Sequence, residues 1–196
     1  MGRLDKQVLL LVLSPFLLCA VDLSVNVAGD AAASGVGNFT FGTLSGDLRG
    51  CLNYINTVTT ASSDTFNITF NLTTGNETIT LSNILPVINL VNTNTVSISG
   101  SNAAGSGTAV TINGGGAFSA FFTRQGTVSL SIMTLSNLAA VGGTGGLTAG
   151  GGALGAGAAL FNDQASVSLS NLSFSSCNAT GGAVSGVLGS SGDAGG

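Results

Sequence analysis

Few side chains in this sequence could do acid–base, nucleophilic or metal chemistry. Histidine is absent from the 196 residues, which removes the commonest general base and the commonest transition-metal ligand. Cys19, Cys51 and Cys177 lie too far apart along the chain to form a cysteine-based metal motif. The remaining candidates are the carboxylates beyond the apolar N-terminus: Asp22, Asp30, Asp47, Asp64, Glu77, Asp163 and Asp193.

Carboxylates would matter most in a polysaccharide hydrolase or lyase, which needs them clustered and often beside a basic residue. None of these acids falls as a close pair in the sequence. Arg124 and Asp163 occupy the same position of two repeat copies, where a surface ion pair of little energetic value is the simpler interpretation. Calcium-binding repeats need regularly spaced aspartates, and only Asp163 and Asp193 follow Thr65. The sequence therefore predicts no catalytic, cofactor or metal site.

The N-terminus has the build of a secretory signal peptide. A short charged start is followed by an apolar run from Val8 to Val21, which is shorter than the roughly twenty residues that span a bilayer. We therefore predict a helical, cleaved signal peptide over residues 1–33, with cleavage near Ala20 or at 31–33. The mature protein is expected to be exported.

Export would leave a mature chain with few reactive or charged groups. Cys51 and Cys177 could be joined in an oxidising compartment, but their wide separation favours two separate buried thiols. Arg49 and Arg124 would be the only basic residues, against an excess of acids. Binding to nucleic acid is not expected, because it needs a basic surface.

One segment of the mature chain has helical periodicity. Apolar residues recur at three- and four-residue steps between Leu44 and Val58. This predicts a helix over about residues 45–58, capped by Ser45 and with Asp47 in its first turn. We assign residues 34–64 to an N-terminal cap, in which the apolar face of the helix covers the open end of the sheet that follows.

From Phe66 onward the apolar period changes to two, which is typical of strands with one buried face. Turn residues separate short segments of this kind. The predicted strands are Phe66 to Leu72, Thr78 to Leu81, Leu85 to Val91, Thr95 to Ser99, Ala109 to Ile112, Thr127 to Leu135 and Ser166 to Phe174. Such spacing suits a sandwich, a barrel or a solenoid.

An internal repeat favours the solenoid. The segment that begins at Phe122 aligns without gaps on the one that begins at Phe161, 39 residues later, and both copies then reach a glycine pair. Stacked coils share sequence because each coil occupies the same environment as its neighbour. We predict an all-β chain, a right-handed parallel β-helix (solenoid) over residues 65–196. A glycine-rich loop insert at 142–158 is expected to project sideways from it.

Short motifs resemble those of bacterial autotransporter-like surface proteins. The block Gly42 to Asn56, followed by Phe66 to Phe70, resembles the opening of secreted parallel β-helix proteins, and Gly150 to Phe161 resembles their glycine-rich insert. The Gly-Gly-Ala motifs at Gly151 and Gly181 are similar to those of polymorphic outer membrane proteins, although Cys177 breaks the partner Phe-x-x-Asn motif.

The resemblance implies the passenger region of a surface protein, held at the outer membrane through a C-terminal barrel that this chain lacks. It implies a non-catalytic scaffold or adhesin at the cell surface or outside the cell, with a host-cell surface, matrix surface or glycan as partner. The chain would be an N-terminal fragment of such a protein. The alternative is the N-terminal coils of a secreted carbohydrate-active β-helix enzyme, a lyase or hydrolase, without its catalytic part.

Overall fold

The computed structural model describes residues 20–31, 37–58, 64–73, 77–91, 93–105, 107–146 and 151–183. These residues are mostly strand with one short helix, α1 (Leu48–Thr57), so the all-β prediction is confirmed. The strands are β1 (Ala20–Val25), β2 (Phe39–Thr40), β3 (Ser45–Gly46), β4 (Thr65–Phe70), β5 (Thr78–Thr80), β6 (Ile88–Asn89), β7 (Thr95–Asn102), β8 (Thr108–Asn113), β9 (Phe121–Gln125), β10 (Thr127–Ser136), β11 (Ala139–Val141), β12 (Leu160–Asn162), β13 (Ser166–Ser175) and β14 (Asn178–Thr180).

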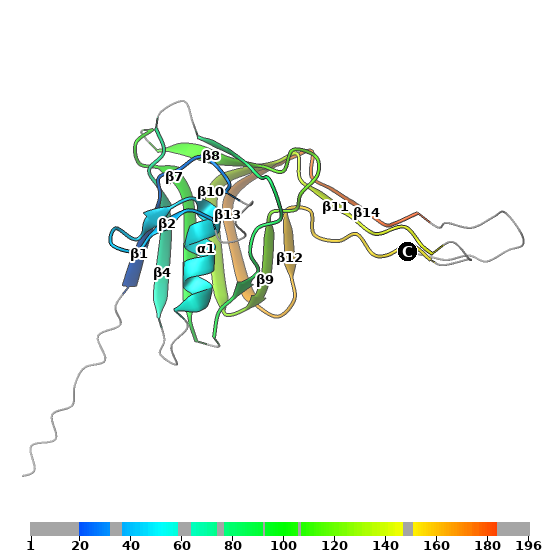
Figure 1. Ribbon diagram of the computed structural model, residues 1–196, viewed down its shortest axis with the longest axis horizontal. Helices are drawn as coiled ribbons and strands as arrows, with labels where there is room; N and C mark the ends of the chain where they lie inside the picture. Colours follow the sequence, from blue (N-terminus) through cyan, green and yellow to red (C-terminus); the bar gives the residue numbers. More distant parts are fainter. Residues whose placement is uncertain are drawn as a thin grey trace, which may run out of the picture.

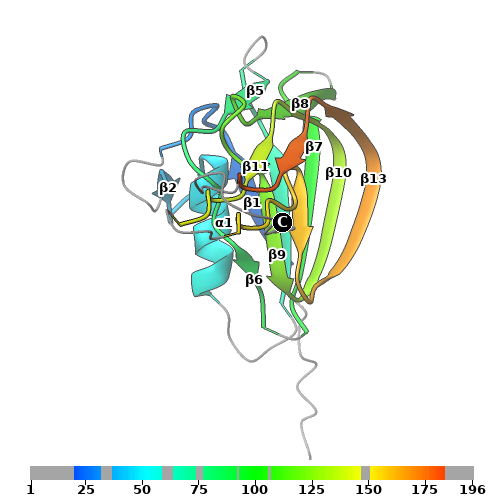
Figure 2. The same ribbon diagram turned by 90° about the vertical axis from the view of Figure 1, so that its right-hand side faces the viewer.

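The strands form three sheets in which most neighbours are parallel and distant in sequence. In the largest sheet β1, β4, β7, β10 and β13 follow one another, and β5 and β8 pair alongside (Figure 1). β9 lies between β6 and β12 in the second sheet, and β11 pairs with β14 in the third. Figure 2 shows β7, β10 and β13 side by side, with α1 on the opposite side of the molecule. Parallel neighbours need long connections, which explains why the contacts are mostly long-range.

Alternation in the sequence decides which face of the large sheet is buried. Phe66, Ile68 and Phe70 of β4 are buried, while the residues between them are polar and more exposed. Phe66 pairs with Val96 and Ile68 with Ile98, so apolar side chains stack in columns from strand to strand. Full burial of each such side chain stabilises the fold by about 1.5–3 kcal/mol.

The register of the strands follows the internal repeat. Ser166 pairs with Thr127, 39 residues earlier, which is the offset of the two aligned sequence copies. In the second half of β10, Met133 pairs with Val110, only 23 residues earlier. The longer offset contains the glycine-rich insert, so the basic unit of the repeat is a little over twenty residues, as the sequence predicts.

α1 lies where the sequence places a helix, but its cap differs from the prediction. Asp47 is the N-cap residue, and its side chain accepts a hydrogen bond from the backbone N–H of Gly50. Ser45 instead belongs to β3, where it pairs with Ser24 of β1. The buried face of α1, which includes Leu48, packs against β1 and β6 at the N-terminal side of the sheets.

The first strand was missed by the sequence analysis. β1 lies within the segment assigned to the signal peptide, yet it pairs in register with all of β4 and buries Leu23 and Val25. The prediction that strands begin at residue 65 is therefore wrong. The sheet starts at Ala20, before the cap, and the cap segment is inserted between β1 and β4.

The final strand of each sheet is β12, β13 or β14, and together we call them the last layer. Leu169 and Phe174 of β13 are 46% and 54% exposed. Their partners in β10, Leu130 and Leu135, are fully buried. The difference arises because no described strand pairs with the far edge of β13.

Candidate functional site

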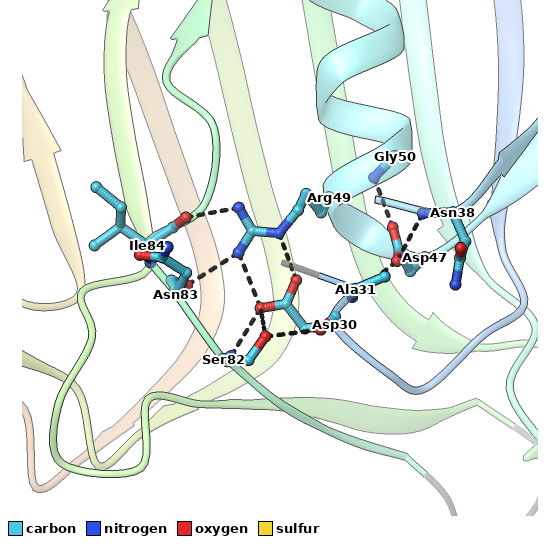
Figure 3. Close-up of polar contacts among 9 residues, drawn as sticks. All are labelled: Asp30, Ala31, Asn38, Asp47, Arg49, Gly50, Ser82, Asn83 and Ile84. Atoms are coloured by element: carbon cyan, nitrogen blue, oxygen red, sulfur yellow. Dashed lines mark hydrogen bonds and ion pairs between the residues drawn. The ribbon is translucent and has the colours of Figure 1, made fainter. Parts of the chain in front are cut away.

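The most connected polar group lies in the cap, where Asp30, Asp47 and Arg49 come together (Figure 3). We call these three residues the cap cluster. Asp30 follows β1, Asp47 caps α1 and Arg49 is in its first turn. α1 positions two of them because residues at its N-terminus face the loop that leaves β1.

Arg49 is held on every side. Its Nε donates to Asp30 Oδ1 at 2.6 Å and its Nη2 to Asp30 Oδ2 at 2.9 Å, a two-point pairing of guanidinium and carboxylate. The other donors reach the carbonyl oxygens of Ile84 at 2.8 Å and Asn83 at 3.0 Å. The side chains of Arg49 and Asp30 are only 5% and 2% exposed. The pair therefore ties the loop after β1, the helix and residues 83–84 into one unit.

Asp30 is stabilised as a carboxylate. Burial by itself raises the pKa of Asp30, but the hydrogen bond and charge of Arg49 and the donors of Ser82 outweigh it and hold the pKa below its usual value. Ser82 donates from its backbone N–H at 2.8 Å to the carboxylate, and its hydroxyl donates at 2.7 Å to the backbone oxygen of Asp30.

Asp47 serves the backbone around it. One carboxylate oxygen accepts from Gly50 N–H at 2.7 Å, and the other accepts from Asn38 at 2.9 Å and Ala31 at 3.1 Å. The residue is fully buried. These bonds join the loop after β1 and the turn before β2 to the helix, so the carboxylate acts as a structural acceptor.

The cap cluster is built for structure, because its donors and acceptors are occupied by the protein itself. A general acid or base must reach a substrate, and Asp30, Asp47 and Arg49 are almost fully enclosed. Sequence reasoning missed the cluster. No local signal links Asp30 to Arg49, since the contact depends on how the chain returns after β1.

The other predicted candidates stay apart. Asp163 is hydrogen-bonded through its backbone to Thr123, the residue before Arg124. Both Arg124 and Asp163 are described, but no ion pair joins their side chains. Asp22 accepts from Asn67 Nδ2 at 2.8 Å, far from the cap cluster in sequence and use. In the described ranges no three acidic or cysteine side chains gather as a metal site would require.

The two described cysteines are separate free thiols. Cys51 is buried in α1, and desolvation, with a smaller contribution from the charge of Asp47, raises its pKa to about 12. Cys177 lies half-buried in the last layer and points its thiol at the carbonyl oxygen of Leu135. A thiol with so high a pKa is a poor nucleophile at neutral pH, so Cys51 is a packing residue.

The glycine-rich insert forms an arm that projects from the sheets (Figure 1). We use the name glycine arm for residues 142–146, 151–157 and 181–183. Its three segments are hydrogen-bonded in a cycle. Gly142 donates to Thr180 at 2.9 Å beside the third segment, Gly182 of the third donates to Ala153 of the second at 2.8 Å, and Ala153 donates to Gly143 of the first at 2.8 Å. The prediction of a sideways insert is correct in direction, but the described part is ordered by its own backbone bonds.

Missing side chains allow the three segments to approach so closely. A Cβ at Gly142 would overlap Ala153, one at Gly152 would overlap Gly182, and one at Gly182 would overlap Gly143. By contrast, a Cβ at Gly143 would meet nothing within 4 Å. The glycines thus divide into interior positions, which the packing requires, and outward positions, which it does not.

We expect Gly152→Ala to open the glycine arm while Gly143→Ala leaves it intact. The added methyl group at position 152 cannot coexist with the carbonyl of Gly182, so the hydrogen bond from Gly182 to Ala153 should break. Hydrogen exchange of the Gly182 amide should accelerate by about tenfold or more in Gly152→Ala, a loss of at least about 1.4 kcal/mol of local protection. Equal exchange rates in the two variants would contradict this packing.

A shallow apolar pocket lies at the base of the glycine arm. It has a volume of about 300 Å³ and is lined by Phe122 and Phe161 together with Leu154. The two phenylalanine rings meet edge to face, with centroids 5.0 Å apart. Apart from the Ser119 hydroxyl its lining side chains are apolar, so it could receive only a small uncharged group.

The described part of the chain has no helix with the length and hydropathy of a membrane span. Its two prominent features are therefore the enclosed cap cluster and the projecting glycine arm. No family model, curated protein or solved structure matches the chain.

Proposed function

We propose that this chain is a non-catalytic, exported surface scaffold or adhesin, built as a right-handed parallel β-helix of the kind found in autotransporter-like passenger regions. One observation carries the proposal. Strands that share a sequence pattern pair parallel and in register at the repeat offset, as Thr127 to Ser131 do with Thr95 to Ser99 on one side and with Ser166 to Ser170 on the other. Stacked coils require this pairing, and sandwiches do not.

A scaffold function agrees with how the chain uses its polar groups. The enclosed charges of the cap cluster hold the first coil together, and the outward positions of the long strands are Ser, Thr and Asn. The glycine arm carries exposed apolar residues, Val141 at its base and Leu154 within it, away from the stack. On this proposal the arm is the displayed element, and its partner is a host-cell surface, a matrix surface or a glycan outside the outer membrane.

The site of signal-peptide cleavage gives a direct test. Cleavage at 31–33 would remove β1 with Leu23 and Val25, and would remove Asp30 from the buried Arg49. We therefore expect the chain, expressed in a bacterium with an outer membrane, to be exported and to begin within a few residues of Ala20. Edman sequencing and intact mass of the exported protein measure this.

Two outcomes would count against the proposal. Retention of the unprocessed chain in the cytoplasm would remove the case for export. Release of oligosaccharides when purified residues 20–196 are incubated with acidic or neutral polysaccharides would show catalysis and support the enzyme alternative. A preparation inactivated by boiling serves as the control for that assay.

A further inference from the structure

The last layer presents apolar side chains at positions that are buried one layer earlier. Leu169 pairs with Leu130 and Phe174 with Leu135, yet the β13 members of these pairs are half exposed. Val167 and Leu172 on the same strand are only partly buried. Leu169 and Phe174 therefore form an apolar face at the C-terminal end of the stack, the size of one coil.

The backbone of this end is also unpaired. β13 pairs only with β10, β12 only with β9, and β14 only with β11, so among the described strands each leaves one edge free. Natural sheet edges are protected by lysine, proline or inward-facing charges. Residues Ser166 to Ser175 contain none of these. The edge of β13 has no feature that would repel another strand.

The opposite end of the stack is closed. α1 packs against β1 and β6, the hairpin of β2 and β3 pairs with the end of β1, and the cap cluster fastens these parts together. A head-to-tail contact would have to place the open end of one copy against this cap. The cap offers no comparable strand edge, so a repeating fibre of copies has no suitable second surface.

We propose that the last layer binds a second copy of this chain, end to end, about a two-fold axis perpendicular to the stack. In this arrangement β13 of one copy lies antiparallel to β13 of the other, and the Leu169 and Phe174 faces cover each other. The contact continues the established stacking of β7, β10 and β13 by one more interface. Since β13 is uncharged, two copies meet without repulsion between like charges.

Analytical ultracentrifugation of purified residues 20–196 tests the proposal, which does not depend on export. The wild-type protein should sediment as a dimer that dissociates on dilution. Leu169→Arg should weaken the dimer by about 100-fold or more, because the two-fold axis brings two arginines into one uncharged contact. Leu154→Arg is the matched control, since Leu154 is 74% exposed but lies in the glycine arm, and it should dimerise like the wild type.

The interface should also be visible by its symmetry. A single spin label at Ser168→Cys, in a Cys177→Ser background that leaves only the buried Cys51, should give one intermolecular distance in the dimer and none after Leu169→Arg. Circular dichroism confirms that each variant is folded. A wild-type protein that stays monomeric at about 100 µM, equal weakening by both arginine variants, or open-ended filaments would each overturn the proposal.

Discussion

Replacing Arg49 with methionine is expected to destabilise the folded protein by about 3–5 kcal/mol. The substitution leaves the Asp30 carboxylate, whose side chain is 2% exposed, without its counter-charge. It also removes the donors to the carbonyl oxygens of Asn83 and Ile84. Methionine keeps most of the side-chain volume, so the loss reports the unpaired charge and acceptors rather than a cavity. The shift of the urea unfolding midpoint of residues 20–196 measures it.

Two further variants separate charge pairing from other effects. Arg124→Met removes the exposed arginine of β9, which forms no ion pair with Asp163, and should change the unfolding free energy by less than about 0.5 kcal/mol. The double variant Asp30→Asn with Arg49→Met should recover part of the loss, because no buried charge remains. If Arg49→Met and Arg124→Met cost the same, the cap cluster does not hold the fold together.

The same pair predicts how stability depends on pH. Asp30 has a lower pKa in the folded protein than in the unfolded chain. Its contribution is therefore complete above the unfolded value of about 3.9 and is lost as the pH falls through the lower folded value. Unfolding midpoints between about pH 5 and pH 2.5 should fall less steeply in Asp30→Asn than in the wild type. Parallel slopes would mean that Asp30 is not stabilised as a carboxylate.

Alternating apolar residues predicted the long strands well. β4, β7, β10 and β13 lie where Phe66 to Leu72, Thr95 to Ser99, Thr127 to Leu135 and Ser166 to Phe174 place them. Burial of one face is a local property of such segments, because every second side chain points the same way. The self-similarity of the last two strands also predicted their register, since identical environments select similar residues.

Features that depend on where the chain returns were not predicted. β1 has the same alternation as β4, in Val21, Leu23 and Val25, but it directly follows the apolar N-terminus and was assigned to the signal peptide. The contact between Asp30 and Arg49 has no periodic signal. The glycine arm was interpreted as a flexible loop because composition does not reveal which glycines face another segment.

The leucines of the two repeat copies provide the second large expected effect. Leu130 and Leu169 pair directly, and each stands between two serines. Leu130 is fully buried between neighbouring strands, whereas Leu169 is 46% exposed. Leu130→Ala should therefore lower the unfolding free energy by about 2–5 kcal/mol, because it removes buried atoms and leaves a cavity.

Leu169→Ala is the internal control, identical in residue type, strand position and flanking sequence. Measured at concentrations low enough to keep the chain monomeric, it should cost less than about 1.5 kcal/mol, since much of its side chain is already in water. At concentrations that favour the proposed dimer the cost should grow, because the second copy covers Leu169. Equal costs for the two variants under dilute conditions would contradict the stacking of β13 on β10 as the outermost layer.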